Sequence, residues 1–182
     1  MPRSQLVLLD ACAVVNLWAC RRMGDVLSGI EGRVAIADVV KRESQYVLVG
    51  GTGDDALERE AIDLASMIES GALDVIEPRD DEELLTFIDL TRDLNDGEAM
   101  TLALAIHRSG VIVTDDRKAL RLSREAGVSL LTSLDLLKNW SESASIPPSE
   151  LRHVLGDLRE RGRFEPSRQH PLRAWWESVF ER

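Results

Sequence analysis

The organisation of this chain is clearest in the stretch LNDGEAMTLALAIHRSGVIVTDDRKALRLSREAGVSLL, residues 94–131. Its first part carries apolar residues at the spacing of one helix face, namely Leu102, Ala103, Ala105 and Ile106. The run VIV at residues 111–113 is continuously apolar and β-branched, as a parallel strand covered on both faces should be. A second helix and a second strand follow. The stretch therefore predicts a helix–strand–helix–strand unit.

Acidic residues stand at the two places in this unit where a helix begins. Asp96 and Glu98 open the first helix, and Asp115 and Asp116 lead from the strand into the second. In an open α/β sheet, ligands bind outside the carboxyl ends of the strands. Two adjacent carboxylates at such an end, with further acids nearby, suggest a site for a hard divalent cation.

The rest of the chain alternates in the same way. Apolar runs predict strands at residues 6–9, 33–37 and 73–76. Amphipathic patterns predict helices at residues 13–27, 39–47, 54–70, 80–94, 134–140, 150–162 and 171–180. The glycine-rich run at 50–53 lacks the Gly-Lys-Ser/Thr ending of a phosphate-binding loop, so we interpret it as a plain loop. The alternation predicts an α/β fold with a doubly wound, mainly parallel sheet.

The C-terminal part of the chain is predicted to be a helical extension. Residues 141–148 are polar and end in two prolines, which is typical of a short linker. We therefore predict a domain at residues 1–140 and an extension at 141–182. The extension combines several arginines with Trp175 and Trp176, residue types that dominate protein interfaces. Two interpretations stay open: an interaction element, or tryptophans that fold back onto the core.

Composition excludes several classes of protein. The net charge is −10, and residues 54–98 are strongly acidic, so the chain is a poor generic binder of nucleic acid. A metal-dependent nuclease remains compatible, because cations partly neutralise its acids. Cys12 and Cys20 fit neither a disulfide framework nor a zinc pattern. No apolar stretch approaches membrane-spanning length, so we expect a reduced, cytoplasmic protein without membrane partners.

Each candidate acid also has a plain structural interpretation. Asp10 follows the first strand and can cap the next helix, and the run Asn95–Glu98 matches a capping box. Taken singly, these interpretations are favoured. For the acids as a group the capping interpretations are weaker, because a parallel sheet brings such strand ends, and the acids that follow them, together along one edge. A carboxylate cluster is costly without a cation, and oxygen ligands select Mg²⁺ or Mn²⁺ over Zn²⁺. Such a site suits phosphodiester hydrolysis.

Four motifs resemble those of PIN-domain nucleases. They are LLDACAVVNLWA at 8–19, VVKRE at 39–43, LNDGEAMTLALA at 94–105 and VIVTDDRKALRLSREAGV at 111–128. Their order and spacing match over roughly the first 140 residues. The resemblance implies a Rossmann-like, three-layer α/β/α fold with a five-stranded sheet of order 3-2-1-4-5. It also implies a ribonuclease site dependent on Mg²⁺ or Mn²⁺, and many bacterial members are VapC-like toxins of toxin–antitoxin pairs.

The resemblance implies a role for each matching position. The catalytic acids expected from it are Asp10, Glu43, Glu98 and Asp116, of which Asp10, Glu98 and Asp116 would hold metal with Asp115 as a helper. Asp96 and Thr114 are secondary candidates. Arg117, Lys118 and Arg121 either meet phosphates or form a solvated basic helix face. One departure is that Ala11 and Cys12 stand where many members have Thr, Ser or Asn after the first acid.

The function predicted is that of a metal-dependent endoribonuclease. The expected partners are an RNA substrate and, for a toxin, an antitoxin protein; a homodimer is also compatible with the sequence. A phosphotransfer receiver is disfavoured, because the Asp pair at 115–116 follows the fourth strand instead of the first. A haloacid-dehalogenase phosphatase is disfavoured, because its Asp-x-Asp-x-Thr motif is absent at Asp10. A catalytically silent PIN fold that acts as a binding or regulatory subunit stays open.

Overall fold

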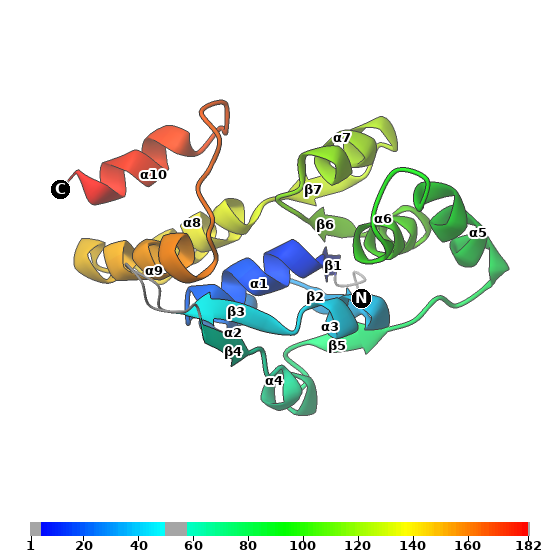
Figure 1. The fold of residues 1–182 in the computed structure, drawn as a ribbon, viewed down its shortest axis with the longest axis horizontal. Coiled ribbons are helices and arrows are strands. Elements are labelled where there is room, and N and C mark those ends of the chain that lie inside the picture. Colours follow the sequence, from blue (N-terminus) through cyan, green and yellow to red (C-terminus); the bar gives the residue numbers. More distant parts are fainter. Residues whose placement is uncertain (1–4, 50–57, 182) are drawn as a thin grey trace.

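The centre of the molecule is a five-stranded parallel sheet of order β5-β2-β1-β6-β7 (Figure 1). The computed structural model describes residues 5–49 and 58–181. Counting only the strands of this sheet in chain order gives 3-2-1-4-5, so the predicted α/β fold is confirmed. The strands are β1 (Leu6–Leu9), β2 (Arg33–Ala37), β5 (Asp74–Ile76), β6 (Val111–Val113) and β7 (Ser129–Leu131).

Helices cover both faces of the sheet. On one side α6 packs on β1, β2 and β6 and contacts α3, α5 and α7; on the other, α1 packs with α2, α8 and α9. Apolar side chains of β1 and β6 are buried on both faces, as their continuous hydrophobic runs predict. The helices are α1 (Ala11–Ala19), α2 (Met23–Ser28), α3 (Asp38–Glu43), α4 (Ala65–Glu69), α5 (Asp81–Leu90), α6 (Asp96–Arg108), α7 (Arg117–Glu125), α8 (Ser133–Ser143), α9 (Pro148–Arg161) and α10 (Arg173–Phe180).

The single helix predicted at residues 13–27 is wrong. It is two helices, α1 and α2, because Arg21 adopts a left-handed φ of 59° between them. The turn closes when the Arg21 N–H donates to the Trp18 carbonyl at 3.0 Å. Breaking the helix here lets Leu17 of α1 and both Met23 and Val26 of α2 reach the core.

A two-stranded antiparallel hairpin replaces helix in two other predictions. The helix predicted to reach residue 47 ends at Glu43, and β3 (Tyr46–Val49) pairs with β4 (Glu58–Ala61). The helix predicted at 54–70 is therefore wrong at residues 58–61, and within the described residues 58–70 only α4 is helical. Cross-strand packing outweighs the helical pattern, since the Arg59 guanidinium lies 4.3 Å from the centre of the Tyr46 ring. The glycine run at 50–53 lies outside the described residues.

The C-terminal helices share the core of the sheet domain. Figure 1 shows α9 beside α1, and the side chains of Leu151, Leu155 and Leu158 are buried in the common core. Trp176 is also buried there, whereas Trp175 is half-buried. The interpretation in which the tryptophans fold back onto the domain is thus the one realised. The boundary at residue 140 remains a prediction. No helix in residues 5–49 and 58–181 is long and apolar enough to cross a membrane.

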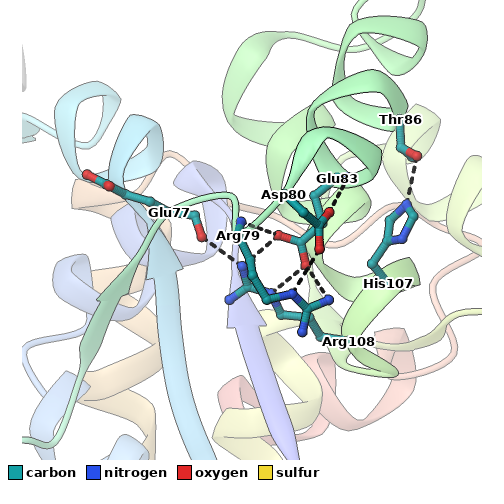
Figure 2. A network of polar contacts seen from close by, with 7 residues as sticks. All are labelled: Glu77, Arg79, Asp80, Glu83, Thr86, His107 and Arg108. Atoms are coloured by element: carbon teal, nitrogen blue, oxygen red, sulfur yellow. Dashed lines mark hydrogen bonds and ion pairs between the residues drawn. The ribbon is translucent and has the colours of Figure 1, made fainter.

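A buried ion pair fixes the antiparallel helices α5 and α6 to each other (Figure 2). Arg108 donates from Nε and Nη2 to the two carboxylate oxygens of Glu83, at 2.8 and 2.7 Å, and Glu83 is fully buried. The same Nη2 donates to the Glu77 carbonyl at 2.7 Å, which ties α6 to the chain after β5. Holding the last turn of α6 in this way fixes where its first turn lies, and Glu98 lies in that first turn.

We predict that Arg108→Met lowers the free energy of unfolding by about 3 kcal/mol, because the buried Glu83 carboxylate loses its main partner. Arg92→Met is the matched control, since Arg92 pairs with Asp89 in the open and such pairs contribute less than about 1 kcal/mol. Urea unfolding of wild type and both variants measures the two effects. Equal losses would contradict a structural role for the buried pair.

The Glu83–Arg108 ion pair should also make the stability of the protein depend on pH. The hydrogen bond from Arg108 holds the pKa of Glu83 below its ordinary value of 4.5. A carboxylate of lowered folded-state pKa contributes stability above its unfolded-state pKa and loses it as the pH falls through the folded-state value. The stability difference between wild type and Arg108→Met should therefore be full at neutral pH and shrink below about pH 4.

Candidate active site

Asp10 is the most deeply buried acid at the carboxyl edge of the sheet. It follows β1 and caps α1, and its Oδ1 accepts the Ala13 N–H at 2.8 Å and the Cys12 thiol at 3.0 Å. Within the described part of the chain its buried Oδ2 has no hydrogen-bond partner. Burial raises the pKa of Asp10 from 3.8 to about 7, against the hydrogen bond from the Ala13 N–H that lowers it.

Cys12 links the ends of β1 and β6. Its thiol donates to Asp10, and its sulfur accepts the Asp115 N–H at 3.2 Å. The Thr114 hydroxyl lies 3.8 Å from the same sulfur and accepts the Asp116 N–H at 3.1 Å. Burial raises the pKa of Cys12, so the group stays a neutral thiol. Cys12 therefore orients one oxygen of the Asp10 carboxylate.

Asp115 is a structural anchor. Its Oδ2 accepts the Asn16 amide at 2.8 Å and the Ser133 hydroxyl, and its Oδ1 accepts the Ser133 N–H at 3.2 Å. These bonds fasten the end of β6 to α1 and to the first turn of α8. Burial raises the pKa of Asp115, while Ser133, Asn16 and the neighbouring His170 oppose the rise. Both oxygens are committed, which favours a supporting role over direct metal ligation.

Asp116 is both a helix cap and a candidate ligand. Its Oδ1 accepts the N–H groups of Lys118 at 2.7 Å and Ala119 at 2.9 Å at the start of α7. The cap uses only this oxygen, so Oδ2 stays available to a ligand. Asp116 can therefore cap α7 with one oxygen and bind a metal with the other.

Glu98 lies between two other carboxylates. It forms the capping box of α6 with Asn95, in which the Glu98 N–H donates to Asn95 Oδ1 at 2.9 Å. Burial raises the pKa of Glu98, and the negative charges of Asp116 and Glu43 raise it further. Glu98 is therefore close enough to both Asp116 and Glu43 for their charges to disfavour its ionised form.

Gly97 is what brings Glu43 into this group. The Gly97 N–H donates to Glu43 Oε1 at 3.2 Å, and a Cβ at residue 97 would lie 2.1 Å from Glu43 Oε2. Burial is the main cause that raises the pKa of Glu43, followed by the charge of Asp96. Asp96 is thus a neighbour of the acidic group, on the exposed first turn of α6.

The predicted phosphate-binding residues lie on the exposed side of α7. Lys118 pairs with Asp93 at 3.0 Å and Arg121 with Glu125 at 2.9 Å. Arg117 lines a cavity of about 170 Å³ together with Asp115 and His170. Exposed ion pairs are worth little and can exchange partners, so both interpretations of this basic face remain.

The arrangement fits a hard cation without forming a finished metal site. Among residues 5–49 and 58–181, no three Asp, Glu, His or Cys side chains are gathered closely enough to hold a metal. Two features nevertheless fit a cation: the Oδ2 of Asp10, which has no partner among the described residues, and the repulsion of Glu98 by Asp116 and Glu43. All of these donors are carboxylate oxygens. Mg²⁺ commonly binds only one or two carboxylates and keeps several waters, so it does not need three protein ligands close together.

A family model described as a PIN domain matches residues 6–170. The chain belongs to the PIN-domain family. The PIN domain is a nuclease fold, and its members typically use divalent metals. Comparison with curated proteins gives no match. The match spans the sheet, all the candidate acids and α9, and it ends at His170 beside Asp115.

Four supporting residues of the PIN site were missed by sequence reasoning: Asn16, Gly97, Ser133 and His170. The sequence could have indicated Asn16, because it is a polar residue on the otherwise apolar, buried side of α1. The sequence could also have indicated Gly97, because glycine destabilises a helix and is expected there mainly where a side chain would not fit. Ser133 reads equally well as an ordinary helix start, and His170 is brought in only by the tertiary fold.

We predict that Asp10→Asn stabilises the metal-free protein at neutral pH. Because burial raises the pKa of Asp10 to about 7, the native state keeps a proton that the unfolded chain releases, and wild type loses stability as the pH rises from about 4 to about 7. Asparagine cannot ionise but still caps α1. Unfolding free energies measured with chelator should show a gain that is absent near pH 4 and reaches about 4 kcal/mol above pH 7.

Asp80→Asn is the matched control. Asp80 also caps a helix, accepting the Glu83 N–H at 3.1 Å, but this bond lowers its pKa. The same linkage makes Asp80→Asn less stable than wild type at neutral pH, the opposite sign. An Asp10→Asn protein that is also less stable there would contradict the assignment of a destabilising buried charge.

Proposed function

We propose that this PIN protein is a divalent-metal-dependent endoribonuclease. The observation that carries the proposal is the buried Asp10, whose Oδ2 lacks a partner among the described residues at the edge where the other acids gather. A polar oxygen buried in this way is costly unless something binds it. A cation would relieve both this cost and the repulsion between Glu98 and Asp116.

Each acid has a distinct part in the proposed site. Asp10, Glu98 and Asp116 would hold Mg²⁺ or Mn²⁺ directly or through water, with Glu43 beside them. When bound, such a metal activates water and stabilises the leaving oxygen in phosphodiester hydrolysis. The chain itself supplies the geometry: Cys12 and Ala13 orient Asp10, and Asp115 holds the end of β6 through Asn16 and Ser133.

The substrate would approach from the side of α7. Arg117 is exposed, and Lys118 and Arg121 are engaged only in exposed ion pairs, so all three can turn to phosphates. Together with the acidic edge they would place a phosphodiester between basic side chains and the carboxylates. RNA as the substrate, an antitoxin partner, a homodimer and a cytoplasmic location are carried by the resemblance and the composition and remain predictions.

A second candidate function is a silent PIN fold that binds without cleaving. One observation favours it: the described residues form no ready-made group of three metal ligands. The two candidates differ in turnover, and both predict that nucleic acid binds at the same edge.

We predict that Mn²⁺ or Mg²⁺ supports cleavage of RNA and that EDTA abolishes it. Asp10→Asn, Glu98→Gln and Asp116→Asn should each lower the rate at least about 100-fold, because each removes a charged oxygen from the same cation. Asp89→Asn is the control, since Asp89 is an exposed acid on α5 outside the group and should keep full activity. Activity that survives both EDTA and Asp10→Asn would refute the proposal, and RNA binding without turnover would establish the silent subunit.

A further inference from the structure

A small cavity adjoins the acidic edge of the sheet on the side of α7. Two of its lining residues, Asp115 and Arg117, are the chain neighbours of Asp116, which we propose as a metal ligand. The other walls come from α7, from Thr132 at the end of β7 and from residues 164–170, which connect α9 to α10. The cavity therefore lies directly beside the proposed metal site.

The wall formed by residues 164–170 is held in place by α10. The rings of Phe164 and Trp176 pack nearly perpendicular with centroids 6.1 Å apart, and Trp176 is only 3% exposed. The Arg173 guanidinium donates to the Glu165 carboxylate at 2.8 Å and to the Pro166 carbonyl at 2.7 Å. The cavity thus exists in the free protein, so a ligand need not order this wall when it binds.

The size and the apolar walls of the cavity fit one flat ring. Its volume is about 170 Å³, and a cavity of about 150 Å³ holds a benzene molecule. Leu120, Phe164 and Pro166 provide its apolar surface. In the recognition of single-stranded RNA, unpaired bases stack on aromatic side chains such as phenylalanine. One nucleobase fits this space, whereas a base pair does not.

The charges of the lining favour a neutral group. Arg117 and Asp115 carry opposite charges, and the charge of Glu165 is balanced by its ion pair with Arg173. The Nδ1 of His170 accepts the Leu172 N–H at 3.0 Å, as a neutral imidazole ring does. The lining therefore has no excess charge to attract an ion, and a nucleobase is neutral.

We propose that this cavity receives one unpaired base of the RNA, stacked on Phe164, while Arg117 contacts a phosphate next to that base. Arg117 is exposed, and in the described part of the chain the ion pairs of α7 are those of Lys118 and Arg121. Because Arg117 follows Asp116 directly, a phosphate held there brings a phosphodiester to the proposed metal. The inference rests on the proposed nuclease function and adds its substrate class, single-stranded RNA.

Fluorescence anisotropy of labelled hexauridylate and hexaadenylate with the full chain tests the proposal. Ca²⁺ replaces Mg²⁺ so that binding is measured without turnover. At least one of the two RNAs should bind at least about tenfold more tightly than an abasic hexamer of the same backbone, because stacking adds affinity only when a base is present. Annealing the complement should weaken binding similarly. Equal binding of the abasic or the duplex probe, or no saturable binding of either RNA, overturns the proposal.

Substitution of Phe164 tests the stacking contact. Phe164→Leu keeps an apolar side chain but removes the ring, so it should lose most of the preference for bases and bind the abasic hexamer as wild type does. Phe180→Leu is the matched control, since the Phe180 ring also packs on Trp176, at 5.4 Å, but does not line the cavity. Arg117→Met should weaken the RNA and the abasic probe alike, because its contact is with phosphate.

A second pair of variants leaves Phe164 intact. Ser167 is exposed and lines the cavity, so Ser167→Leu narrows it and should also remove the preference for bases. Gln169→Leu is the control, because Gln169 is equally exposed but lies outside the lining. Melting temperatures establish that each variant is folded. A base preference that survives both Phe164→Leu and Ser167→Leu contradicts the assignment.

Cleavage with Mn²⁺, measured in parallel, separates this inference from the nuclease proposal. A wild-type protein that cleaves RNA but binds the abasic hexamer equally well contradicts the base site alone. A protein that does not cleave, yet loses its base preference in Phe164→Leu, contradicts the nuclease activity and supports the base site.

Discussion

The structure depends on one constraint: the parallel pairing of β1 and β6 buries the carboxylate of Asp10 beside the end of β6. Leu9 pairs with Val113, and the Asp10 N–H donates to the Val113 carbonyl at 3.1 Å, so Asp10 and Thr114 leave the sheet side by side. Burial there raises the pKa of Asp10 to about 7 and leaves one of its oxygens without a partner among the described residues. The surrounding polar residues either orient this carboxylate or hold in place the chain that buries it.

Two kinds of contact keep that geometry. Both carboxylate oxygens of Asp115 accept hydrogen bonds, from Asn16 and Ser133. These bonds join the end of β6 to α1 and α8 on one side of the sheet. On the other side, the buried pair of Glu83 and Arg108 fixes α6 from its last turn. Because a helix is stiff, fixing its last turn places Glu98 at the first. The acids of the candidate site are thus positioned by residues that need not touch a substrate.

Much of this was predictable from the chain, for a physical reason. Short β-branched runs such as residues 111–113 allow few alternatives to a buried strand, and the acids that follow such runs must gather at one sheet edge. The failures have a shared cause. Arg21 breaks a helix and Tyr46 enters a hairpin because tertiary contacts outweigh a local helical pattern. Arg108, the partner of Glu83, lies 25 residues away in the sequence, and Glu60, the partner of Arg161, lies 101 residues away. A local sequence pattern cannot predict such distant pairs.

The central claim is that Asp10 and the acids of α6 and α7 share a hard cation. Anomalous scattering from crystals grown with Mn²⁺ tests it most directly. The account predicts a peak about 2.0–2.5 Å from Oδ2 of Asp10, with Glu98 and Asp116 joined to the same ion directly or through water. A peak bound only by other acids, with Asp10 left outside the coordination shell, would contradict it.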